Sequence, residues 1–112
     1  MTSTQEIPNP PRGRLGEDAR AFWRNVLADN DLEPASQEIL LHACEQMDVA
    51  LRAGDELRKR ESLMVTDRYG QERPHPLLAV QREAHNAFVR HMKALGINLE
   101  PLHDGPGRPP GV

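Results

Sequence analysis

The sequence has few of the residues on which disulfides, cysteine-based metal sites and membrane spans depend. Aromatic residues make up 4% of the 112 residues, and Cys44 is the single cysteine. One cysteine forms neither an intramolecular disulfide nor a cysteine-based zinc site. No apolar run approaches the roughly 18 residues that a membrane span needs, and no signal-peptide pattern occurs. We therefore expect a soluble cytoplasmic protein without membrane contact.

The motifs of common nucleotide-using enzymes are also missing from the sequence. No glycine is followed by Lys-Ser or Lys-Thr, and Gly105 and Gly107 do not begin a dinucleotide-binding fingerprint. No nucleophile, base and orienting group stand at a useful spacing. We expect no enzymatic activity and no cofactor.

Metal-binding patterns are similarly weak. His85 and His91 lie about 240° apart around a helix at about 100° per residue, so they do not face one ion. Glu45, Asp48 and Asp55 resemble the acids of a two-metal nuclease, but their positions also fit the polar side of an amphipathic helix. We expect no metal site.

Proline and glycine are concentrated at the two ends of the chain. Residues 1–15 contain three prolines, and the end of the sequence reads Asp-Gly-Pro-Gly-Arg-Pro-Pro-Gly-Val. Such compositions favour solvated, extended segments. The sequence therefore predicts a flexible arm over 1–15, a helical domain over 16–96 and a flexible tail over 97–112.

Apolar residues recur at helical spacing in three parts of this domain. The spacing predicts a helix over 17–30, a long helix from 34 to about 61, and a third helix over 77–95. Gly54 is the expected place for the long helix to bend or end, Glu33 is a weak candidate cap, and Gly96 is the expected stop of the third helix. The predicted apolar positions are Ala19, Phe22, Trp23, Val26, Leu27, Ile39, Leu40, Ala43, Cys44, Met47, Ala50, Leu51, Leu57, Leu77, Val80, Ala84, Phe88, Met92 and Leu95.

The segment 63–75 breaks this helical pattern. Leu63 to Thr66 is partly β-branched, and Tyr69-Gly70 is a turn signal, which indicates a small hairpin or an extended crossover. The predicted fold is mainly α, with an N-terminal helix packed on a long helical hairpin. We expect Trp23 and Cys44 to lie in its core.

Acidic and basic residues are concentrated in different parts of the predicted helical domain. The chain has a formal net charge of −3, but residues 29–57 contain eight acids and one base, whereas 58–93 contain eight bases and four acids. Two interpretations remain open. The opposite charges either neutralise each other within one helical hairpin or form complementary surfaces between subunits.

Two segments carry more specific patterns. The first is Leu15-Gly-Glu-Asp-Ala-Arg-Ala-Phe-Trp-Arg24, and the second runs from Val65-Thr-Asp-Arg-Tyr-Gly through His75-Pro-Leu-Leu to RHMKALGINL at 90–99. With the acidic helix between them and the Gly-Arg-Pro-Pro-Gly tail, they resemble the small subunits of tailed-phage terminases over about residues 12–110. The resemblance implies a non-enzymatic DNA-packaging subunit in the host cytoplasm. It implies assembly into a cyclic ring, binding of double-stranded viral DNA, and presentation of that DNA to a large subunit with the ATPase and nuclease.

No helix-turn-helix pattern is recognisable, so candidate DNA contacts follow from charge. Pro11-Arg12-Gly13-Arg14 is similar to hooks that enter the minor groove, although such a segment is also a common linker. Arg20 and Arg24 share one edge of the first helix. Arg58, Lys59 and Arg60 form a second strip, or else an ordinary positive helix C-terminus. The alternative function is a helical protein-interaction adaptor that binds no DNA.

Overall fold

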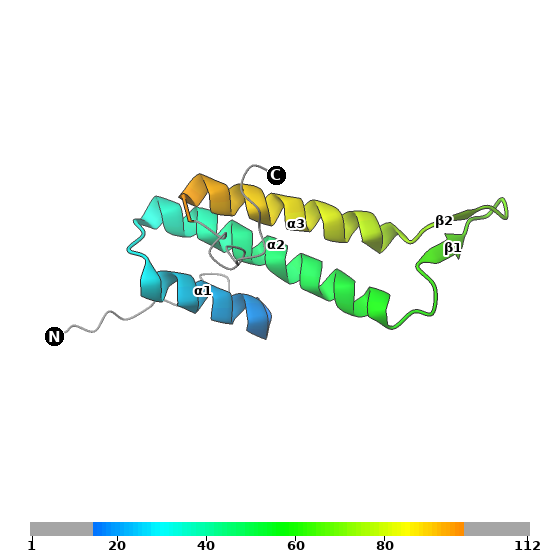
Figure 1. The fold of residues 1–112 in the computed structure, drawn as a ribbon, viewed down its shortest axis with the longest axis horizontal. Helices are drawn as coiled ribbons and strands as arrows, with labels where there is room; N and C mark the ends of the chain where they lie inside the picture. The colour runs from blue at the N-terminus through cyan, green and yellow to red at the C-terminus, as the bar shows by residue number, and fades with distance from the viewer. Residues whose placement is uncertain (1–14, 98–112) are drawn as a thin grey trace, which may run out of the picture.

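The computed structural model describes residues 15–97, which form three helices and one two-stranded sheet (Figure 1). The helices are α1 (Glu17–Asp29), α2 (Pro34–Arg58) and α3 (Pro76–Leu95). Strands β1 (Met64–Thr66) and β2 (Glu72–Pro74) connect α2 to α3. The mainly α fold predicted from the sequence is confirmed, whereas the predicted arm and tail lie outside the described residues except for Leu15 and Ile97.

The long helix runs unbroken from Pro34 to Arg58, so the prediction of a bend or an early end at Gly54 was wrong. Gly54 is buried against α3, and a Cβ atom there would stand 2.8 Å from Nε2 of Gln81. A missing side chain at this point lets the two helices approach closely. Glu33 makes no side-chain cap.

Both ends of α3 are capped by local hydrogen bonds. The imidazole Nδ1 of His75 accepts a hydrogen bond from the backbone N–H of Leu77 over 3.0 Å, a cap that the sequence analysis missed. At the other end Gly96 adopts a left-handed conformation, as predicted, and its N–H donates to the carbonyl groups of Met92 and Lys93.

The core joins α1 to the first half of α2 and the last half of α3. Trp23 and Cys44 are both buried there, as predicted, at 1% and 0% exposure. Leu15, before α1, and Met92 of α3 belong to the same cluster. Phe22 adds an edge-on contact with Phe88, with ring centroids 5.4 Å apart.

The other half of the α2–α3 hairpin is not covered by α1. Because α1 begins beside Asp48, a helical face that is buried at Leu40 and Cys44 continues without a cover at Leu51. Leu51 is 38% exposed and Val80 is 39% exposed, so these two members of the predicted apolar faces lie at the surface. α1 does not reach far enough along α2 to bury Leu51, and Val80 lines a groove on the other side of the two helices.

The antiparallel hairpin projects beyond the ends of α2 and α3 (Figure 1). Met64 pairs with Pro74, and Thr66 pairs with Glu72. All strand residues are exposed except the half-buried Val65. The hairpin predicted over 63–75 is therefore present, and it presents both of its faces to solvent.

Candidate nucleic-acid interface

Two arginines on the outer surface of α1 make no ion pair with any residue of the described range 15–97. Arg20 and Arg24 are exposed one helical turn apart, beside the buried face formed by Ala19 and Trp23. Within residues 15–97 neither guanidinium contacts a carboxylate at ion-pair distance. Their full charge is therefore available to a phosphate backbone.

The second predicted strip is placed differently. Arg58 pairs with the carboxylate of Asp55. The ammonium group of Lys59 lies 3.2 Å from the carboxylate of Glu56. Nε of Arg60 donates to the backbone carbonyl of Ser62 over 3.3 Å. Two of the three cations therefore have a carboxylate neighbour on the same helix, which weakens their attraction for phosphate. Arg12 and Arg14 lie outside the described residues.

A basic face on α3 was not predicted from the sequence. Arg82, Arg90 and Lys93 are exposed and make no ion pair within the described part of the chain. Their spacing places them within about 80° around the helix axis, against Glu83 as the sole acid of α3. This spacing could have predicted the basic face from the sequence.

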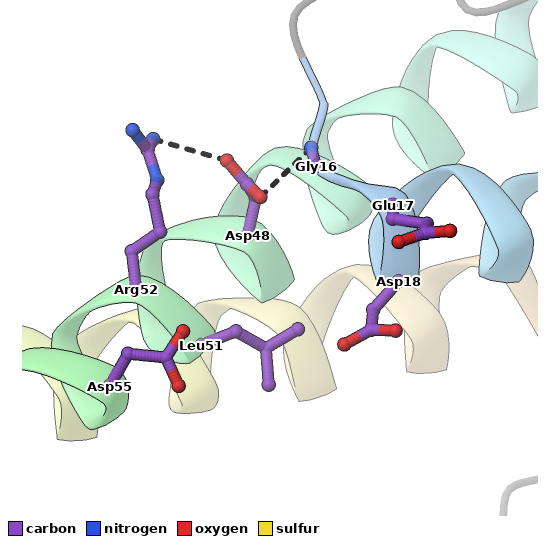
Figure 2. Close-up of a pocket in the computed structure, with 7 residues that line it drawn as sticks. All are labelled: Gly16, Glu17, Asp18, Asp48, Leu51, Arg52 and Asp55. Atoms are coloured by element: carbon purple, nitrogen blue, oxygen red, sulfur yellow. Dashed lines mark hydrogen bonds and ion pairs between the residues drawn. The ribbon is translucent and has the colours of Figure 1, made fainter. Parts of the chain in front are cut away.

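The start of α1 is fixed by a buried carboxylate, shown in Figure 2. Oδ1 of Asp48 accepts a hydrogen bond from the backbone N–H of Gly16 over 3.0 Å, and Oδ2 lies 3.1 Å from the guanidinium of Arg52. Asp48 is 8% exposed, so its predicted place on the polar side of the helix was wrong. It serves the fold by tying the α1 junction to α2.

A pocket of about 390 Å³ opens beside this junction (Figure 2). Its lining combines four carboxylates, Leu51 and one guanidinium, and the acids are Glu17, Asp18, Asp48 and Asp55. Arg52 does not compensate these charges. Such a pocket repels phosphate groups.

Histidine and cysteine have structural surroundings in the described region. The rings of His42 and His91 lie 6.0 Å apart, but no group of three or more His, Cys, Asp or Glu within residues 15–97 is arranged to hold a metal. Burial, and to a smaller extent the Glu45 carboxylate, raise the pKa of the Cys44 thiol to about 12. The thiol is therefore protonated and unreactive at neutral pH.

No helix in the described part of the chain is long and apolar enough to cross a membrane. What the surface offers instead is a set of charged helix faces around a small core. These features define a small, mainly helical protein with charged faces.

Comparison with family models identifies the family. The model described as phage terminase, small subunit, matches residues 19–100. This chain belongs to that family, and its role is therefore in phage DNA packaging. No curated protein and no solved structure was found to match it.

Proposed function

We propose that this chain recognises double-stranded viral DNA and delivers it to the large terminase subunit. The observation that carries the proposal is the family match over residues 19–100, which covers α2, α3 and α1 except for its first two residues. In this proposal the chain does no chemistry itself. The large subunit supplies the ATPase and nuclease, and the small subunit recruits or regulates it in the host cytoplasm.

The DNA contacts are assigned to α1 and the arm that precedes it. Arg20 and Arg24 are exposed and make no ion pair among the residues that the structure describes, and the arm adds Arg12 and Arg14. A chain with net charge −3 attracts DNA only through such local concentrations of positive charge. The acidic pocket beside Asp48 then restricts DNA to the basic edge of α1.

Cyclic assembly is the second part of the proposal. Leu51 of α2 and Leu63 and Met64 of the β-hairpin segment are exposed, and a monomer gains nothing from this exposure. A ring also repeats a weak basic site around its circumference. Repetition raises the affinity for a long polymer such as DNA through effective concentration.

Matched double variants test the DNA surface. Arg20→Ala with Arg24→Ala removes two unpaired charges, and we expect duplex binding at low salt to weaken by about tenfold or more. Arg58→Ala with Lys59→Ala removes the same charge from paired residues and is expected to change the affinity much less. Fluorescence anisotropy with a labelled duplex measures both.

A third double variant shows which helix carries the DNA-binding site. Arg90→Ala with Lys93→Ala has the same charge change on α3. If this variant alone loses binding, the DNA surface lies on α3 and the assignment to α1 is wrong. If the parent binds no duplex, the adaptor function replaces the DNA function.

A further inference from the structure

The exposed large apolar side chains of the described region lie in two separate regions. One is the uncovered half of the α2–α3 hairpin, where Leu51 and Val80, at 38% and 39% exposure, line grooves on opposite sides of the two helices. The other lies on the β1–β2 segment and contains Leu63, Met64 and Tyr69, at 46%, 40% and 78%. We call this second region the hairpin patch.

The two regions do not meet within one molecule. The β-hairpin points away from the helices, beyond the ends of α2 and α3 (Figure 1). Its apolar side chains are exposed in the described part of the chain. They are therefore available to a second molecule.

The hairpin patch is held in a defined shape. Oδ1 of Asp67 accepts hydrogen bonds from the backbone N–H groups of Tyr69 and Gln71 over 2.8 and 2.9 Å. Its Oδ2 lies 2.7 Å from Nε of Arg73 on the opposite strand. The backbone N–H of His75 also donates to the carbonyl of Leu63 over 2.7 Å. An ordered element loses less entropy on binding than a loose loop does.

The helices offer a groove for this patch. Between α2 and α3 lies a groove of about 410 Å³, which we call the α2–α3 groove, lined by Ala50, Leu51, Leu78, Gln81, Arg82 and His85. Leu51 also lines the pocket at the start of α1, so the groove opens where the cover provided by α1 ends. An apolar segment placed there would continue the layer that α1 begins.

Charge distinguishes this groove from the one on the other side of the two helices. The opposite groove, of about 220 Å³, is bordered by Arg52 and Glu56, which already pair with Asp48 and Lys59. The rim of the α2–α3 groove carries Arg82, which makes no ion pair within residues 15–97. Glu72 of the hairpin is exposed and equally without an ion pair in that range, so a hairpin in the groove offers Arg82 an acid.

We propose that the β-hairpin of one copy of this chain inserts Met64, which lies on the same face of the hairpin as Glu72, into the α2–α3 groove of the next copy. This contact joins two different surfaces, so it is head-to-tail, and it closes into a ring when the rotation between neighbours allows. The inference rests on the assembly part of the proposed function and assigns its residues.

Light scattering on three variants of the full chain tests the assignment. Leu63→Lys with Met64→Lys removes the hairpin patch, which lies far from the core, and Leu51→Lys blocks the groove. We expect both variants to be monomers at micromolar concentrations at which the parent is an oligomer. Val80→Lys is the matched control, because Val80 is equally exposed but lines the opposite groove, and this variant keeps the mass of the parent.

Mixing the two monomeric variants gives the sharper result. The Leu51→Lys chain has an intact hairpin and the hairpin variant has an intact groove, so a head-to-tail contact predicts a 1:1 heterodimer of twice the monomer mass. Circular dichroism shows whether each variant is folded. If the hairpin variant keeps the parent mass, the assignment is overturned whatever happens to Leu51→Lys.

Two further outcomes separate this inference from the proposed function. If the folded variants are monomers but never combine, the contact is not head-to-tail between these surfaces, while assembly itself stands. If the parent is a monomer at micromolar concentration and moderate salt, the assembly part of the proposed function fails first, and this inference fails with it.

Discussion

Asp48, in the middle of α2, accepts a hydrogen bond over 3.0 Å from the backbone N–H of Gly16, which lies 32 residues earlier in the chain. A Cβ atom at Gly16 would stand 2.7 Å from the same carboxylate oxygen. The contact therefore needs both a buried acid and a residue without a side chain. It ties the start of α1 to the middle of α2.

We expect Asp48→Ala to lower the free energy of unfolding by about 1–3 kcal/mol, because it removes the acceptor of the Gly16 N–H and the partner of Arg52. Asp55→Ala is the matched control. Asp55 pairs with Arg58 at an exposed position, where ion pairs contribute little, so its loss should stay below about 0.5 kcal/mol. Urea denaturation of both variants compares them, and equal losses would show that the Gly16 contact is not stabilising.

Trp23→Ala should lower the free energy of unfolding by about 3–5 kcal/mol, because it removes the largest fully buried side chain of the core and leaves a cavity. Arg24→Ala, at the next position and exposed, should be close to neutral. Thermal melts followed by circular dichroism measure the difference. A Trp23→Ala variant that melts like the parent would contradict the core role of this side chain.

The Cys44 thiol should resist alkylation in the folded protein and react once the chain is unfolded. Its pKa is raised from 9.0 to about 12 in the folded state. The thiol is neutral in both states below the unfolded pKa, so its contribution to stability is fully present there and is lost as the pH rises toward 12. Iodoacetamide labelling at pH 8 with and without urea measures this, and rapid labelling of the native protein would contradict it.

The order of the β-hairpin should depend on the ionised Asp67 carboxylate. The hydrogen bond with Arg73 first, and the backbone N–H groups of Gln71 and Tyr69 next, lower the pKa of this carboxyl. The interaction is therefore present above the ordinary pKa of aspartate and is lost as the pH falls through the lowered one. We expect the amide resonances of Tyr69 and Gln71 to shift in that range, and Asp67→Ala to give the same shift at neutral pH, whereas Glu61→Ala should not.

Periodicity predicted the helices and most of the core because both depend on local spacing. The ends of α1 and α3 and the burial of Trp23 and Cys44 follow from that spacing. The exposure of Leu51 does not, because it depends on how far α1 reaches along α2. A helical pattern marks which side of a helix is apolar, but not where the covering element stops.

The candidate site was predicted less completely than the fold. The sequence pointed to Arg20 and Arg24 as well as to Arg58 and Lys59, but spacing alone did not show that the second pair lies beside Asp55 and Glu56. The burial of Asp48 was equally hidden, since its partner Gly16 is distant in sequence. Long-range contacts of this kind need the fold before they can be assigned.

The most direct test of the DNA-binding function is a salt titration of duplex binding by the parent and by Arg12→Ala with Arg14→Ala. Neutralised phosphates release counterions, so the logarithm of the parent's affinity should fall linearly with the logarithm of the salt concentration, by about 0.9 per phosphate contact. The double variant should show a slope flatter by about two units per participating subunit at an unchanged oligomer mass. A folded parent that binds no duplex even at low salt would contradict the account, and an unchanged slope would remove the arm from the DNA site.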